Sequence, residues 1–170
     1  AGRGDIWGAE LELRAVPSPN FSMNAAVGYT NADYKEFLTF ITGGTTPVDV
    51  SNAREFQNTP KFTASVSATA SGDLLGGTIS FTPAVSLRSD AYMFEIPTPA
   101  LDPDGYFLVD ASAAWTSPDD VFKLSVNLRN LTNERYRVGG YNFPGALFGN
   151  SIIGYYGPPR TATFNIEYRF

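Results

Sequence analysis

The residues that could carry chemistry are few, and their spacing is that of a polar surface. The 170 residues contain no His and no Cys, so the usual general base, the commonest metal ligand and any disulfide or thiolate site are missing. Glu10 and Glu12 form the clearest carboxylate pair. Because they lie two residues apart on a predicted strand, they share one face, and we interpret them as wall polarity and cross-strand ion pairs. No enzymatic activity is therefore predicted for this chain.

Cofactor, metal and nucleic-acid sites are also poorly supported. Asp102-Pro103-Asp104-Gly105 offers two carboxylates, whereas Ca²⁺ takes about six to eight oxygen ligands, so a loop turn is the better interpretation. The chain has 17 acidic and 12 basic residues and a net charge of −5, with no basic run. Such a chain lacks the electrostatic footprint of a nucleic-acid-binding protein. We predict no cofactor, no metal and no nucleic-acid partner.

Strict alternation of apolar and polar residues predicts that these side chains are positioned by β-strands. Seven alternating segments are predicted, at about 7–15, 21–30, 62–70, 79–88, 107–115, 122–129 and 162–170. Pro83 falls inside the fourth segment and cannot donate to a ladder, so a bulge or weakened pairing is expected there. The Gly/Tyr/Asn-rich residues from about 132 to 158 are expected to form a long loop.

Strand and loop lengths favour a membrane barrel. With a few flanking residues added to each alternating segment, the predicted strands are about 10 to 13 residues long, whereas globular strands usually have about five or six and tilted transmembrane strands about 9 to 11. The connections alternate as about 4, 24, 7, 17, 4 and 27 residues, and membrane barrels have short turns on one side and long loops on the other. The sequence thus predicts an all-β, antiparallel transmembrane β-barrel whose chain ends on the side of the short turns.

The two faces of the predicted strands differ in charge. One face carries Glu10, Glu12, Arg14, Arg88, Asp110, Lys123, Arg129, Glu167 and Arg169. Burying this set in a dry core would cost several kcal/mol per ion, so we expect it to face a wet lumen while the apolar face meets lipid. A soluble β ligand-binding domain would reverse the two faces, and alternation alone does not separate these cases. Seven strands do not make a bacterial barrel, so other strands, from the same chain or another, are expected to complete it.

Several motifs resemble those of TonB-dependent outer-membrane receptors. Asn127–Tyr136 contains an N-L-x-N-x-x-Y stretch like the one that follows their penultimate strand. Gly157-Pro158-Pro159-Arg160-Thr161, followed by an alternating segment that ends at Phe170, is similar to their final strand. Gly8–Glu12 and Tyr106–Asp110 resemble two other strand openings of the family.

The resemblance implies that residues 1–170 are the C-terminal portion of a 22-stranded barrel, without its plug domain. It implies a receptor in the outer membrane of a Gram-negative bacterium that imports siderophores, haem, cobalamin or oligosaccharides. The implied partners are membrane lipid, the remaining strands and plug, the TonB complex and the barrel-assembly machinery. A general porin and an outer-membrane protease or phospholipase are the alternatives, and the missing His argues against the enzymes.

Two groups of residues are candidate sites. Aromatic and amide side chains near the outer end suit stacking and hydrogen bonding to a sugar or an aromatic chelate. The predicted ligand-binding residues are Tyr136, Tyr141, Asn142, Phe143, Phe148, Tyr155 and Tyr156. Tyr168 and Phe170 resemble the C-terminal signal that the assembly machinery reads, although interfacial aromatics would look the same.

Overall fold

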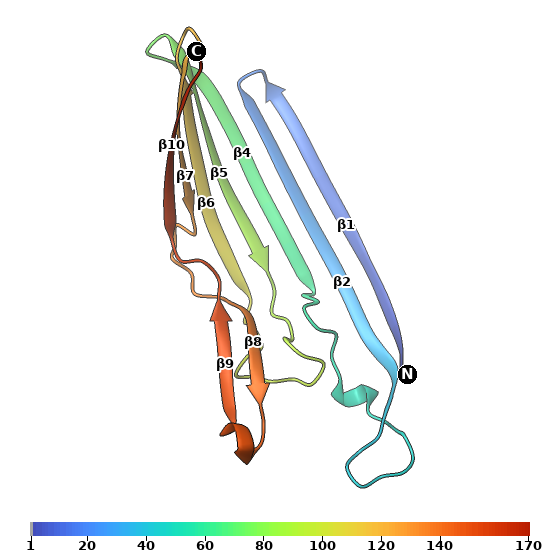
Figure 1. Ribbon diagram of the computed structural model, residues 1–170. Coiled ribbons are helices and arrows are strands. Elements are labelled where there is room, and N and C mark those ends of the chain that lie inside the picture. Colours follow the sequence, from blue (N-terminus) through green and yellow to red (C-terminus); the bar gives the residue numbers. More distant parts are fainter. Residues whose placement is uncertain (1) are drawn as a thin grey trace.

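The chain folds into one long, antiparallel β-sheet, which a computed structural model describes for residues 2–170 (Figure 1). The strands on the main path of this sheet are β1 (Gly2–Ser18), β2 (Phe21–Thr39), β4 (Phe62–Leu74), β5 (Gly77–Arg88), β6 (Tyr106–Thr116), β7 (Phe122–Arg129) and β10 (Thr161–Tyr168). Each pairs with the next in this order, and β3 (Val48–Asp49) pairs with the end of β2. The seven strands and their antiparallel order are as predicted.

Strand lengths depart from the prediction at both ends of the sheet. β1 has 17 residues and β2 has 19, because their pairing continues past the apolar segment to Gly2 opposite Phe37. Residues 35–39, expected in the long connection, therefore extend β2 to Thr39. β7 and β10 have eight residues each; β7 has the bounds of its predicted alternating segment, whereas β10 ends at Tyr168, two residues before the predicted end.

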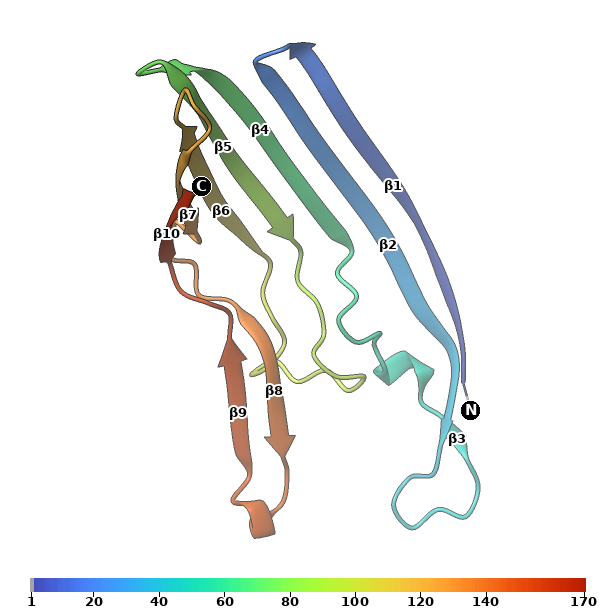
Figure 2. The ribbon, with the colours of Figure 1, turned by 45° about the horizontal axis from the view of Figure 1, so that its top comes forward.

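The segment 132–158 is not the unstructured loop that was predicted. It forms a hairpin of β8 (Arg137–Phe143) and β9 (Ser151–Tyr156), which projects beyond the sheet (Figure 2). A short 3-10 helix, η2 (Ala146–Phe148), makes its tip. Its glycines suggested a loop. In the hairpin, however, Gly140 pairs with Gly154, and a pair of glycines fits the ladder without a steric clash.

Short turns and long connections lie at opposite ends of the sheet, as predicted (Figure 1). The β4–β5 turn consists of Leu75 and Gly76, whose φ angles are 53° and 77°. Two positive φ angles match the twist of a tight hairpin, and glycine adopts such an angle at little cost. The chain ends near the short turns, also as predicted (Figure 1).

Pro83 weakens one pairing of β5 without a bulge. The β4–β5 register passes from Ser67 opposite Ala84 to Ala70 opposite Phe81, so two intervening pairs are missing while the register is kept. A hydrogen bond of 2.8 Å between the hydroxyl oxygens of Thr69 and Thr82 spans this gap. The weakened pairing expected from Pro83 is confirmed.

The large apolar side chains of the sheet lie exposed on one face instead of packing in a core. Among residues 2–170, the buried hydrophobic residues are Ala91, Met93 and Leu101, all in the β5–β6 connection. By contrast, Leu11 is 70% exposed and Ile166 is 78% exposed. A soluble β-domain would place such residues in a packed core, so the apolar face needs lipid to cover it. None of the helices in residues 2–170 has the length and apolarity to cross a membrane.

Aromatic residues mark two levels on this apolar face. Trp7, Tyr29 and Phe62 form a chain at the long-loop end, with ring centroids 5.1 and 4.9 Å apart. Phe122 and Tyr168 contact each other at the other end at 5.1 Å. β6 carries Phe107 and Trp115 near its two ends, and eight residues of tilted strand span roughly 20 Å of height. These levels match the aromatic girdles that flank the lipid-facing band of membrane barrels.

Candidate functional site

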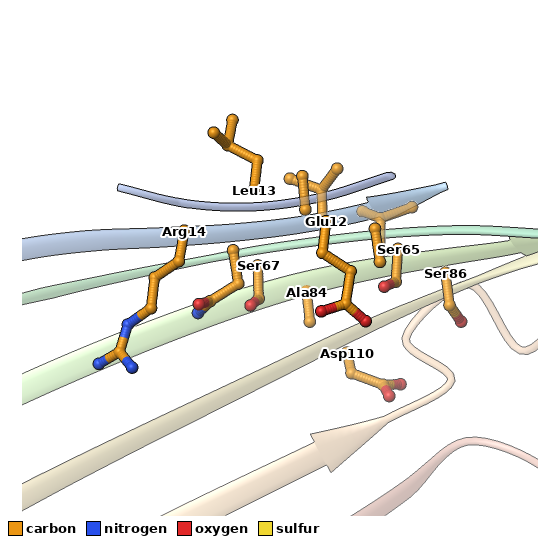
Figure 3. Close-up of a pocket in the computed structure, with 13 residues that line it drawn as sticks. Glu12, Leu13, Arg14, Ser65, Ser67, Ala84, Ser86 and Asp110 are labelled. Carbon is orange, nitrogen blue, oxygen red and sulfur yellow. The ribbon is translucent and has the colours of Figure 1, made fainter. Parts of the chain in front are cut away.

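The polar face of the sheet forms a wall of aligned rows. The register places Glu12, Ala26, Ser65, Ser86 and Leu108 in one row across β1, β2, β4, β5 and β6. Arg14, Asn24, Ser67, Ala84 and Asp110 make the next row. The labelled polar side chains of Figure 3 project from one side of the strands and Leu13 from the other. The charged side chains therefore share one face, as predicted.

This wall encloses a shallow hollow of about 590 Å³, lined mainly by short side chains. Ser65, Ser67 and Ser86 form its centre, while Glu12 and Asp110 stand at opposite edges (Figure 3). The ion pairs found in residues 2–170 are Arg137–Asp104 and Arg169–Glu167. Glu10 and Glu12 take part in no ion pair within residues 2–170, and their pairing across the free edge of β1 stays a prediction. Around the hollow, Glu12, Arg14 and Asp110 form no ion pair within residues 2–170 and remain available to water.

Arg88 is an exception on this wall, because part of its guanidinium group is covered. Its Nε and Nη2 atoms are buried and have no hydrogen-bond partner in the described chain. Arg88 lies opposite Thr63 on one side and Tyr106 on the other, at the long-loop end of β5. A buried cation without a partner is costly, so this position is suited to an acceptor group from a segment outside residues 2–170.

The two C-terminal motifs meet at the base of the β8–β9 hairpin. Asn130 is only 3% exposed, and its side-chain Nδ2 donates to the carbonyl oxygens of Glu134 (2.9 Å) and Pro158 (3.1 Å). Its Oδ1 accepts from the Glu134 backbone N–H at 2.7 Å. Asn133 Oδ1 likewise accepts from the backbone N–H of Arg160 at 3.1 Å. The motif asparagines thus tie the exit of β7 to the entrance of β10; we call these contacts the Asn130 junction.

Tyr136 belongs to the same junction. Its carbonyl accepts from the Gly157 N–H at 2.9 Å, and its ring stacks on Tyr106 with centroids 4.4 Å apart. A Cβ at Gly157 would lie 2.1 Å from the Tyr136 ring, so any larger residue there would push the ring off its stack with Tyr106. Burial raises the pKa of Tyr136, and the neighbouring Tyr106 and Asp110 add to the shift. The tyrosine is therefore a neutral, packed part of the hairpin base.

Four of the predicted ligand-binding residues gather on one face of the hairpin. Tyr141 lies 5.8 Å from Phe143 and 5.9 Å from Tyr155, measured between ring centroids. Phe148, in η2, lies 6.0 Å from Phe143. Tyr141, Phe148 and Tyr155 remain about half exposed. We call Tyr141, Phe143, Phe148 and Tyr155 the aromatic face.

The other predicted residues lie elsewhere. Asn142 and Tyr156 alternate with the aromatic face along β8 and β9 and so point to the opposite side of the hairpin. The guanidinium of Arg135 lies 4.6 Å from the ring centroid of Tyr156, in a cation–π contact. At the chain end, Tyr168 packs on Phe122, whereas Phe170 is fully exposed. The assembly role of Tyr168 and Phe170 stays a prediction.

Sequence reasoning missed two residues that hold the hairpin in place, Leu101 and Arg137. Leu101, in the β5–β6 connection, is 1% exposed and lies against the hairpin glycines. Arg137 donates to the Ala100 carbonyl at 2.7 Å and pairs with Asp104 at 3.0 Å. The sequence signal that could have found the hairpin is the pair of β-branched and aromatic runs around Gly140 and Gly154.

Comparison with known proteins agrees with this architecture. Residues 1–131 match the family described as TonB dependent receptor-like, beta-barrel. Comparison with proteins of curated function gives no significant match.

Solved structures of several receptors share the fold. The ferric yersiniabactin uptake receptor FyuA from Yersinia pestis has a TM-score of 0.77 and 22% identity over 100% of this chain and 24% of its own. The siderophore receptor PiuA from Acinetobacter baumannii has a TM-score of 0.76 and 19% identity over 98% of this chain and 22% of its own. BauA, the ferric preacinetobactin receptor of the same species, has a TM-score of 0.71 and 20% identity, with coverage of 98% and 22%.

The chain thus spans about a quarter of the length of these solved receptors. Its matched residues include β1 to β7, while β8, β9 and β10 lie beyond the family match but within the structural one. Members of this family are transporters, not enzymes, and lie in the outer membrane of Gram-negative bacteria. The chain belongs to the TonB-dependent receptor-like β-barrel family.

Proposed function

We propose that this chain forms the C-terminal portion of the barrel of an outer-membrane receptor that imports ferric chelates of the siderophore class. The aromatic face on the projecting β8–β9 hairpin is the observation that carries the substrate class. The names of three structurally similar receptors, all of which concern siderophores, support the same choice. Haem, cobalamin and oligosaccharides remain the competing substrates.

The aromatic face suits a chelate with planar rings. Aromatic pairs contribute about 0.5 to 1.5 kcal/mol beyond the area they bury, and phenol oxygens add hydrogen bonds at the ring edge. Tyr141 is 53% exposed and Tyr155 is 49% exposed, so ligand rings can stack without displacing the hairpin. The polar wall of the main sheet, with its serine hydroxyls, then offers hydrogen bonds to a polar cargo without holding it tightly at one position. No covalent step is needed.

The other partners follow from the same proposal. The apolar face of the sheet contacts membrane lipid, and the free edges of β1 and β10 pair with other strands of the barrel. The plug and the TonB complex supply gating and energy through parts of the receptor other than residues 1–170. The assembly machinery reads the end of the chain at Tyr168 and Phe170.

The test uses the full-length receptor and a panel of ferric phenolate, catecholate and hydroxamate chelates, with haem and cobalamin as competitors. We expect tight binding of at least one aromatic ferric chelate and about tenfold weaker binding by Tyr141→Ala, equal to about 1.4 kcal/mol. Ile152→Ala is the matched control, because Ile152 is similarly exposed but lies on the opposite face of the hairpin. Exclusive binding of haem, cobalamin or an oligosaccharide would reject the substrate class. Equal losses of affinity in Tyr141→Ala and Ile152→Ala would show that the aromatic face is not the ligand-binding surface.

A further inference from the structure

A leucine from one connection lies in a socket on the hairpin of another. Among residues 2–170, Leu101 is the most deeply buried large side chain, at 1% exposure. A Cβ placed on Gly140 would lie 2.7 Å from Leu101 Cδ2, and one on Gly154 would lie 3.7 Å from the same atom. The same Cβ would lie 2.6 Å from the Ile153 carbonyl oxygen, so glycine at 140 is needed for the hairpin backbone and also leaves room for Leu101. Gly140 and Gly154 alternate with Tyr141 and Tyr155 along β8 and β9, so Leu101 contacts the side of the hairpin opposite the aromatic face.

Arg137 adds a polar contact at the edge of the socket. Its Nη1 donates to the Ala100 carbonyl at 2.7 Å, and its Nη2 donates to Asp104 Oδ2 at 3.0 Å. The Arg137 side chain is 21% exposed, whereas that of Asp104 is 96% exposed. Solvent screens the ion pair with such an exposed carboxylate, so the short, charge-assisted hydrogen bond to the Ala100 carbonyl is the stronger constraint.

The connection that carries Leu101 is braced independently of the hairpin. Asp102 Oδ1 accepts from the Met93 N–H at 2.9 Å, and its Oδ2 accepts from the Thr98 N–H at 2.8 Å. The Leu101 N–H donates to the Thr98 carbonyl at 2.7 Å. On its far side, Glu95 accepts from Gln57 Nε2 at 2.6 Å, which anchors the connection to the β2–β4 loop. The socket thus joins the hairpin to a firm support.

We propose that Leu101 and Arg137 are positioning residues that hold the β8–β9 hairpin so that its aromatic face receives the ligand. This inference rests on the proposed function. The hairpin leaves the sheet at the Asn130 junction, and the socket is its second attachment. With the socket lost, the hairpin pivots at its base, and only a fraction of receptors presents the aromatic face at any time. Apparent affinity falls by that fraction.

The first test needs no ligand. A nitroxide label is attached to Leu147→Cys, at the hairpin tip, where the native side chain is 90% exposed. We expect the label to be more mobile after Leu101→Ala than in the receptor that keeps Leu101, because the hairpin that carries it then moves as a whole. Leu75→Ala is the matched control, since Leu75 is 85% exposed in a turn at the opposite end of the sheet. Leu101→Met, which refills the socket, is expected to restore the lower mobility. An unchanged spectrum in Leu101→Ala overturns the proposal.

The second test separates positioning from contact. The probe is the tightest-binding ferric chelate of the panel above. Leu101→Ala is expected to slow association about tenfold and leave dissociation unchanged, because it lowers only the competent fraction. Tyr141→Ala, a contact variant, is expected to speed dissociation instead. Arg137→Gln is expected to slow association, and Asp104→Asn to change it less than twofold. A mobile label together with unchanged association overturns the positioning role.

The two proposals fail in different ways. If no ferric chelate binds the wild-type receptor, the proposed substrate class is wrong, while the spin-label test still decides whether the socket holds the hairpin. If chelates bind but Leu101→Ala affects association and dissociation like a contact variant, the positioning role is wrong and the substrate class stands. Unheated gel mobility of each variant shows that its barrel is folded.

Discussion

Replacement of Asn130 is the sharpest test of how the hairpin base is built. Asn130 makes three side-chain hydrogen bonds while buried, and its φ of 51° lies in the left-handed region. Each bond contributes about 0.5 to 1.5 kcal/mol net. Alanine at a left-handed φ costs a further 1 to 2 kcal/mol, roughly. We expect Asn130→Ala to lower the free energy of opening the hairpin base by about 3 to 6 kcal/mol.

Hydrogen exchange of the Gly157 amide in the full-length receptor measures this opening. Gly157 donates to the Tyr136 carbonyl and makes no hydrogen bond to Asn130, so it reports the whole junction. A loss of about 3 kcal/mol lowers its protection factor by roughly a hundredfold. Asn130→Gly also removes the side-chain hydrogen bonds, but glycine adopts a left-handed φ without strain. Its loss in the free energy of opening is therefore expected to be about 1 kcal/mol smaller than that of Asn130→Ala.

Asn133→Ala is the matched control. Asn133 also has a left-handed φ, of 54°, but is exposed and accepts one backbone hydrogen bond. Its replacement is expected to cost about half as much. A Gly157 protection factor that falls less than tenfold in Asn130→Ala would refute the reasoning, as would equal effects from the two asparagines.

Three other predictions test the faces, a turn and a loop. Val66→Arg, on the lipid face midway along β4, is expected to destabilise the folded barrel by about 2 to 4 kcal/mol, as measured by urea unfolding in lipid vesicles. Ser65→Arg, on the polar wall, is expected to change the free energy of unfolding by less than about 1 kcal/mol. Equal costs would place both residues in one environment. Leu75→Asn, at a φ of 53°, is expected to stabilise the β4–β5 turn by roughly 0.5 to 1 kcal/mol in the same assay, and a loss would contradict the turn geometry. Asp49 accepts from the Phe37 N–H at 2.9 Å, and this backbone bond is the main cause of its lowered pKa. Because the folded pKa lies below the unfolded one, the stabilisation is present above the ordinary pKa of Asp and is lost as pH falls through the folded value. Protection of the Phe37 amide, corrected for intrinsic exchange, should therefore fall below about pH 4, and Asp49→Asn should abolish that pH dependence.

Local pattern was enough to determine the main sheet from sequence. Alternation places the side chains of a strand on two faces whatever the strand pairs with, so the split between Leu13 and Glu12 could be predicted from their adjacency alone. The alternating lengths of the connections likewise determined which end carries the loops. The charged wall and the lipid-facing band follow from these two local facts.

The tertiary structure alone decided which residues hold the candidate site together. Residues 132–158 are rich in Gly and Asn, which locally favour turns, and pairing across the hairpin overrides that preference. The burial of Leu101 depends on Gly140, 39 residues away, and the role of Asn130 depends on Pro158, 28 residues away. Such contacts leave no periodic trace, because they depend on where two distant segments meet in space. The sequence therefore determined the sheet and its two faces, and the fold in three dimensions determined the position of the aromatic face.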